Sequence, residues 1–101
     1  MTNDAETLQR LVDYADIKQI LAQHSRGIDR SDARLFDSVH HDDATVDYGF
    51  FNGAASEFAT VVTSGNTDSP PTLHRSSNIW IKLQGDTALS ESYVTAYSAD
   101  T

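Results

Sequence analysis

Residues 14–30 carry a helical pattern that ends beside a carboxylate. Apolar positions in this run recur every three or four residues, which gathers them on one face of a helix. They are Ile17, Ile20, Leu21, His24 and Ile28. Asp13 is a candidate N-cap, and Asp29 falls at the edge of the apolar stripe. An acid there can face a cavity beside the core, or together with Ser31 or Asp32 it can cap the next helix.

Three further helical patterns are shorter. A first helix that opens at Asn3 or Asp4 is expected ahead of the main run. Residues 31–40 are amphipathic and predict a second helix antiparallel to the main one. Residues 54–62 predict a short helix, although two valines at its end also suit a strand.

From residue 44 the pattern changes to the two-residue repeat of a strand with one buried face. Val46, Tyr48 and Phe50 alternate with polar or small residues, and Asn52-Gly53 has strong turn chemistry. A strand that ends in a turn at Asn52-Gly53 is therefore expected.

Two longer strands follow a loop. Residues 63–72 are rich in Ser, Thr, Asn, Gly and Pro, which predicts the loop. Alternation over residues 73–83 and 87–99, joined by a tight turn, predicts an antiparallel hairpin. The helices and a three-stranded antiparallel sheet predict an α+β fold. The last strand would leave an exposed edge, so we expect further strands or a homo-oligomer, a dimer or trimer, to cover it.

Composition narrows the possible functions. The chain has 101 residues, of which 39% are hydrophobic, as expected for one soluble domain over residues 1–101. Its net charge of −8 argues against nucleic acid or anionic membrane as partners. It contains no cysteine, so a disulfide or thiolate metal site is excluded. The N-terminus does not have the pattern of a signal peptide, and no apolar run is long enough to span a membrane, so we expect a cytoplasmic protein.

The histidines are the first candidates for chemistry. His24 lies in the apolar stripe, where a core or pocket-lining residue is expected. Residues 40–43, His-His-Asp-Asp, resemble a metal tract, but neighbours in an extended segment point in opposite directions. We therefore interpret them as a polar turn and expect no metal site.

His74 begins a strand directly after the loop, where a strand end can meet a cavity or simply face solvent. Paired with Asp29, it could act as a base, because a carboxylate fixes the tautomer of imidazole and raises its basicity. Tyr48 could donate a hydrogen bond to charge that develops on a substrate oxygen, or it could be a core aromatic residue.

The order of these pieces resembles the SnoaL-like branch of the NTF2-like superfamily over residues 8–99. The resemblance rests on four short motifs: GIDR at 27–30, TVDY at 45–48, LHRSSNIWI at 73–81 and GDTALSESY at 85–93. It implies a cone-shaped, curved antiparallel sheet wrapped around the N-terminal helices, with a pocket at the open end. It also implies about two more strands after residue 99, so we expect the domain to be truncated at its C-terminus.

Two enzyme families of that superfamily resemble this chain at its candidate site. The scytalone dehydratases resemble it at Asp29, Asp47-Tyr48 and His74, and the hexachlorocyclohexane dehydrochlorinases at Asp29 and His74. The resemblance implies a cofactor-free lyase or isomerase that acts on a hydrophobic small molecule, with His74 as base, Asp29 as its orienter and Tyr48 as a donor. Ser98 stands where scytalone dehydratases have a second pocket histidine. The alternative is a non-catalytic ligand-binding or assembly module, similar to the small subunits of ring-hydroxylating dioxygenases.

We expect five residues to contact the substrate: His24, Val46, Phe50, Trp80 and Tyr93. Strict alternation over residues 73–83, however, puts His74 on the face opposite Ile79 and Ile81. Either a bulge near Ser76 and Ser77 brings His74 to the isoleucine face, or the face with Trp80 is the concave one.

Overall fold

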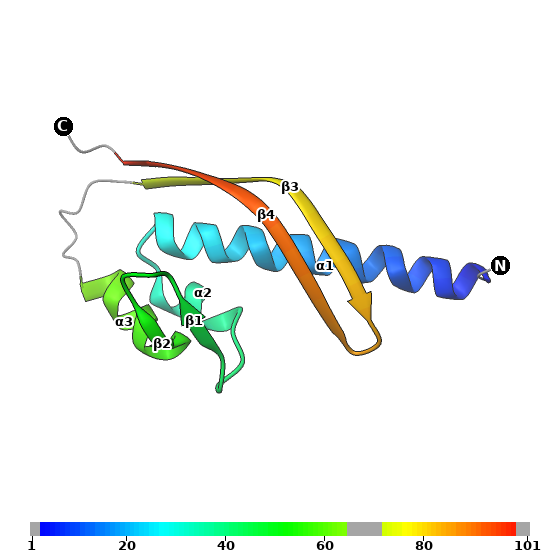
Figure 1. The fold of residues 1–101 in the computed structure, drawn as a ribbon, viewed down its shortest axis with the longest axis horizontal. Helices are drawn as coiled ribbons and strands as arrows, with labels where there is room; N and C mark the ends of the chain where they lie inside the picture. Colours follow the sequence, from blue (N-terminus) through cyan, green and yellow to red (C-terminus); the bar gives the residue numbers. More distant parts are fainter. Residues whose placement is uncertain (1–2, 65–71, 99–101) are drawn as a thin grey trace.

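The computed structural model describes residues 3–64 and 72–98, and Figure 1 shows their arrangement. A long helix lies beneath a curved β-hairpin, and a smaller group of helices and short strands packs near the C-terminal end of that helix. The predicted α+β class is confirmed. The elements are α1 (Asp4–Asp29), α2 (Ala33–Ser38), β1 (Thr45–Asp47), β2 (Asn52–Ala54), α3 (Ala55–Ser64), β3 (Thr72–Gln84) and β4 (Thr87–Ser98).

Helix α1 is continuous, so the predicted break at Asp13 is wrong. Its N-cap is Asn3, whose side chain accepts a hydrogen bond of 2.8 Å from the backbone N–H of Glu6. Asp13 accepts a bond of 2.8 Å from Gln9 Nε2, one turn earlier on the helix surface. Because neither glycine nor proline interrupts the helix before Gly27, nothing breaks it at Asp13.

The connection from α1 to α2 is tight. Ser31 takes the left-handed conformation with φ +51°, and the side chain of Asp32 accepts a bond of 3.1 Å from Leu35 N–H. Asp32 is therefore the N-cap of α2, and Asp29 is free of the capping role that the sequence allowed. A Cβ added to buried Gly27 would lie 2.9 Å from the backbone nitrogen of Phe36, so glycine lets the two helices approach closely.

The first hairpin differs from the prediction. Tyr48 N–H bonds to the carbonyl of Phe51 at 2.8 Å, and Gly49 takes φ +82°, so the chain reverses at residues 48–51. Asn52-Gly53, predicted as the turn, lies in β2 and pairs with β1. The reason is that Gly49 adopts positive φ without strain and Asp47 Oδ1 accepts a bond of 2.9 Å from its N–H.

The second hairpin, β3 and β4, carries a β-bulge. Ser77 pairs with Tyr93 and Trp80 pairs with Glu91, so three steps along β3 match two steps along β4. Asn78 within this shift has φ +51°. Burial alternates from Thr72 to Ser76 and resumes, shifted by one residue, at Ile79. The bulge thus places His74 on the face that Ile79 and Ile81 share, which answers the question left open by the sequence.

The core lies between the C-terminal half of α1 and the smaller group of elements. Phe36 is fully buried, and it packs with Phe58 and Ala59. Partly buried residues surround this cluster: Ile28, Ala33, Val46, Tyr48 and Phe51. The face of β3 with His74 packs on α1, and Ser92 and Val94 of β4 line a cavity on the same side of the hairpin. Leu73, Tyr93 and Tyr97 remain largely exposed.

The described residues form two two-stranded antiparallel sheets, in place of the single three-stranded sheet that was predicted. The sheets differ from the prediction because the chain reverses at residues 48–51. The predicted first strand therefore forms a short hairpin, β1 and β2, and does not join the longer strands. The predicted loop falls largely on residues 65–71, outside the described part of the chain. Within the described residues, none of the helices combines the length and apolar character needed to cross a membrane.

Asn78→Val tests the bulge. A β-branched residue is strained in the left-handed region, so the substitution should lower the free energy of unfolding by about 1–2 kcal/mol, measured by urea denaturation. Asn78→Gly is the matched control, because glycine adopts this conformation without strain. Equal stability of the two variants would contradict the importance of this backbone conformation.

Candidate active site

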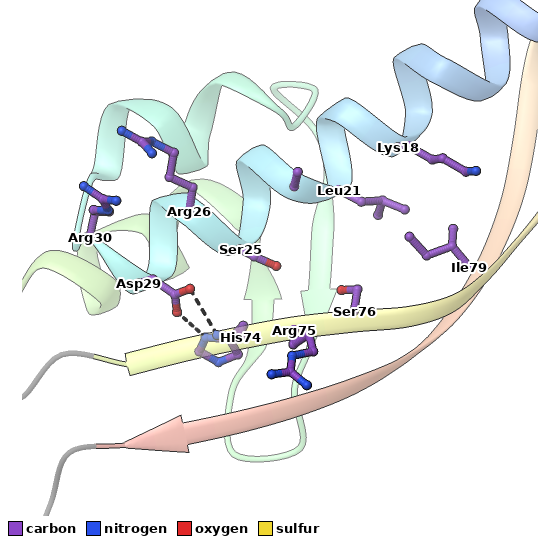
Figure 2. Close-up of a pocket in the computed structure, with 11 residues that line it drawn as sticks. Lys18, Leu21, Ser25, Arg26, Asp29, Arg30, His74, Arg75, Ser76 and Ile79 are labelled. Atoms are coloured by element: carbon purple, nitrogen blue, oxygen red, sulfur yellow. Dashed lines mark hydrogen bonds and ion pairs between the residues drawn. The ribbon is translucent and has the colours of Figure 1, made fainter.

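Asp29 and His74 meet where the end of α1 approaches the start of β3 (Figure 2). His74 Nδ1 lies 2.5 Å from Asp29 Oδ1, and the backbone N–H of His74 donates to Asp29 Oδ2 at 3.0 Å. Thr72 Oγ1 donates a third bond of 3.0 Å to Asp29 Oδ1. The side chains are mostly covered, with 16% of Asp29 and 24% of His74 exposed. The carboxylate is therefore fixed by three bonds from one strand.

This geometry assigns the proton on the imidazole ring. An ionised carboxylate only accepts hydrogen bonds, so Nδ1 of His74 carries a proton, and in the neutral ring the lone pair is on Nε2. Burial by itself raises the pKa of Asp29, but the hydrogen bonds from His74 and Thr72 outweigh burial and the pKa is lowered. Asp29 is thus ionised and holds the imidazole of His74 through Nδ1.

An apolar cavity of about 460 Å³ lies between α1, the aromatic cluster and the inner face of the β3–β4 hairpin. Its size is within the usual range for small-molecule sites. His74 and Tyr48 both line it. The remaining lining residues are Leu21, His24, Ser25, Ile28, Phe50, Phe58, Ser76, Ser92 and Val94. A hydrophobic ligand here would contact the imidazole and the phenol together.

His24 and Tyr48 form a second polar pair in this cavity. His24 Nε2 lies 2.9 Å from the Tyr48 hydroxyl. Burial raises the pKa of Tyr48, so the phenol stays protonated. Burial lowers the pKa of His24, and the neighbouring His40 and His74 lower it further, so this imidazole stays neutral. The cavity therefore combines a carboxylate-paired histidine with a neutral histidine bonded to a phenol.

The packing of aromatic rings fixes the position of this second pair. Tyr48 and Phe58 have ring centroids 4.5 Å apart, and His24 and Phe36 have centroids 5.1 Å apart. His40 Nδ1 donates to the Phe36 carbonyl at 2.8 Å, which places its ring 5.6 Å from that of His24. The core cluster and the site thus share residues.

The predicted substrate-contacting residues lie in three different places. His24 and Phe50 line the apolar cavity, although Phe50 is 81% exposed. Val46 packs against the core cluster. Trp80 and Tyr93 line a wider hollow of about 1100 Å³ that Tyr48 also borders. The structure therefore brings His74, Asp29, Tyr48 and His24 together, and contacts of all five residues with a substrate stay predictions.

Several residues of the site went unrecognised in the sequence. Thr72 bonds to Asp29, but it falls at the end of a loop-like stretch that gave no signal of this contact. Ser92 and Val94 line the cavity from β4. The sequence shows that these smaller residues alternate with larger ones along the strand. It does not show which of the two faces lines the cavity, because that depends on how the hairpin packs against α1.

The residues at 40–43 adopt the polar turn that their pattern indicated. In the described part of the chain, no three His, Cys, Asp or Glu side chains come close enough together to hold a metal ion.

The comparisons agree with this fold. The family model of the SnoaL-like domain matches residues 9–101. A crystal structure of a candidate scytalone dehydratase from Novosphingobium aromaticivorans DSM 12444 superposes with a TM-score of 0.79 at 23% identity, covering 91% of this chain. This chain spans 64% of that protein. No curated protein matches the chain significantly. The chain belongs to the SnoaL-like family, a branch of the NTF2-like superfamily.

Proposed function

We propose that this protein is a cofactor-independent lyase or isomerase that abstracts a proton from a hydrophobic small molecule, with His74 as the base. One observation carries the proposal: His74 is bonded to Asp29 through Nδ1 while its ring lines an apolar cavity. An imidazole held through Nδ1 beside an apolar cavity is suited to removing a proton from carbon. Membership of the family supports the same class of reaction.

In the proposed reaction, Nε2 of His74 takes a proton from a carbon next to a carbonyl or a leaving group. The ring becomes an imidazolium, which the ionised Asp29 stabilises through the Nδ1 bond. The same Nε2–H then returns the proton. Delivery to a departing hydroxyl gives elimination, a lyase reaction, and delivery to another carbon gives isomerisation.

Tyr48 is the proposed electrophilic donor. His24 Nε2–H would donate to the Tyr48 oxygen, which leaves the phenolic O–H to donate to the substrate oxygen where negative charge develops. The lowered pKa of His24 and the raised pKa of Tyr48 support this arrangement, because both groups then remain neutral at physiological pH. His24 is a positioning residue in this scheme.

His74→Ala tests the base. We expect turnover in a screen of cyclic carbonyl compounds to fall by roughly 10²–10⁴-fold, since a positioned base contributes about that factor. Turnover would be followed as exchange of substrate C–H for deuterium in D₂O, and ligand binding should be retained. His41→Ala is the matched control at an exposed turn. Binding without exchange for every ligand in the unaltered protein would instead support the non-catalytic binding or assembly module.

Tyr48→Phe tests the donor while keeping the ring that packs on Phe58. Loss of one hydrogen bond to developing negative charge should lower kcat by about 10²-fold with little change in KM. Tyr97→Phe, at an exposed position on the outer face, is the control. An unchanged kcat for Tyr48→Phe would remove the electrophilic role.

Asp29→Asn tests the ionised carboxylate through pH. The pKa of Asp29 is lowered in the fold, so the unfolded chain binds more protons between the lowered and the ordinary value. The stabilisation from Asp29 is therefore full above its ordinary pKa and is lost as pH falls through the lowered one. Near pH 7 the variant should be less stable by about 2 kcal/mol in urea denaturation.

The difference between Asp29→Asn and the unaltered protein should shrink as pH falls below the ordinary carboxyl range. Asp42→Asn, at an exposed turn, serves as the control and should leave the pH profile unchanged. A stability difference that is constant from neutral to acid pH would show that the charge of Asp29 is unimportant.

A further inference from the structure

The N-terminal half of α1 carries an apolar stripe that the described chain leaves largely exposed. Figure 1 shows this end of the helix (blue) extending past the β3–β4 hairpin. The N-terminal stripe consists of Leu8, Leu11, Val12 and Ala15. At about 3.6 residues per turn, they fall within about 100° of the helix circumference. Leu8 is 63% exposed, Leu11 59% and Val12 44%. A contiguous exposed apolar surface of this kind is typical of a site of protein–protein contact.

Packing within the chain does not account for these apolar residues. The face of α1 that lines the apolar cavity carries Leu21, His24 and Ile28. At about 100° per residue, the N-terminal stripe lies on roughly the opposite side of the helix from those three residues. The stripe therefore contributes neither to the core nor to the candidate active site.

A groove lies directly beside the stripe, between α1 and β3. It has a volume of about 550 Å³. Its apolar and aromatic lining consists of Leu11, Tyr14, Ala15, Ile79, Trp80 and Ile81. Trp80 is 50% exposed, so the groove is open to a partner. Leu11 and Ala15 belong to both the stripe and the groove, which makes the two one continuous surface.

This surface is complementary to itself when two α1 helices pack antiparallel. If a two-fold axis passes beside Leu11, residues at equal distances before and after Leu11 face each other across the axis. Leu8 lies three residues before Leu11 and Tyr14 lies three residues after it. Leu8 of one copy therefore meets the groove of the other at Tyr14, next to Trp80. The symmetry repeats this contact, so each copy supplies one protruding leucine and one groove.

The charges at the border of the surface also match in this arrangement. Lys18 is the one charged residue among those that line the groove, all of which lie in the described chain. It comes seven residues after Leu11, and Asp4 comes seven before, so Lys18 of one copy faces Asp4 of the other. Among the described residues, neither of them forms an ion pair within its own chain. Parallel helices would instead place like charges opposite each other, which is unfavourable.

We propose that the N-terminal stripe and the adjoining groove form the interface of a homodimer, in which two α1 helices pack antiparallel about Leu11. This interface is separate from β4, whose exposed edge led us to expect a partner from the sequence. An anionic membrane suits the stripe less well, because the chain has a net charge of −8 and Asp4 and Glu6 lie at the same end of the helix. The proposal does not rest on the proposed reaction, since dimerisation requires no turnover.

Trp80 is the single tryptophan of the chain and can report on the interface. The unaltered protein, diluted from millimolar concentration, should show a monomer–dimer equilibrium in sedimentation equilibrium. Over the same concentrations the emission of Trp80 should move to shorter wavelength as the dimer forms, because Leu8 of the second copy covers the indole. Leu8→Gln should weaken dimerisation roughly tenfold or more, since each dimer buries two of these leucines.

Leu89→Gln is the matched control, because Leu89 is 55% exposed and lies on β4, outside the interface. It should change the dimer dissociation constant less than twofold. Circular dichroism checks the fold of each variant, and Leu11→Gln replaces Leu8→Gln if that variant does not fold.

A charge exchange tests the antiparallel arrangement. Asp4→Lys and Lys18→Glu should each weaken the dimer by about two- to tenfold, because each places like charges opposite each other. The double variant Asp4→Lys/Lys18→Glu should recover most of the lost affinity, because the ion pair forms again with its signs reversed. Losses that simply add in the double variant would contradict the antiparallel register.

Three further results would overturn the proposal. The first is a protein that stays monomeric at every concentration, and the second is a dimer that Leu8→Gln and Leu89→Gln weaken equally. The third is binding of the monomer to vesicles of anionic lipid through Leu8, which would identify a membrane as the occupant of the stripe. Loss of turnover in His74→Ala has no bearing on these measurements, because they contain no substrate. Failure of the dimer and failure of the proposed reaction are thus separate outcomes.

Discussion

A single carboxylate joins the two main elements of the structure. Asp29 lies at the C-terminal end of α1, where the helix dipole disfavours negative charge by roughly 0.3–1 kcal/mol. Three hydrogen bonds from Thr72 and His74 offset this cost, since bonds to a charged group contribute about 1.5–3 kcal/mol each. All three donors belong to β3, so the interaction that orients the imidazole also fastens the hairpin to the helix.

The aromatic core provides the other side of the site. Phe36 and Phe58 are buried under α1, and Tyr48 and His24 extend from that cluster into the cavity. The position of Tyr48 depends on the reversal at Gly49, which ends β1 just before it. Close approach of α2 at Gly27 brings Phe36 and His40 against His24. The contacts that pack the aromatic core therefore also position the side chains of the proposed site.

Local sequence patterns predicted the helices and the long hairpin. The pairing of Asp29 with His74 was predicted from their residue types and from the family resemblance. The local patterns gave wrong predictions where two alternatives are locally possible and tertiary packing decides between them. Asn52-Gly53 has better turn chemistry than Gly49, yet the reversal occurs at Gly49. Asp13 could cap a helix, but it lies within one. The contact of Thr72 with Asp29 joins residues 43 apart in sequence, which no local pattern reports.

The bulge in β3 determines what the strand presents to the cavity. Strict alternation inward from Ile81 and Ile79 would bring Ser77 and Arg75 to the inner face and turn His74 outward. One extra residue at Asn78 reverses that outcome for every position before it. The first half of β3 is thus out of phase with the second, so a one-residue deletion there would turn His74 outward, away from Asp29, and would bring Arg75 to the inner face together with its outward-facing neighbours.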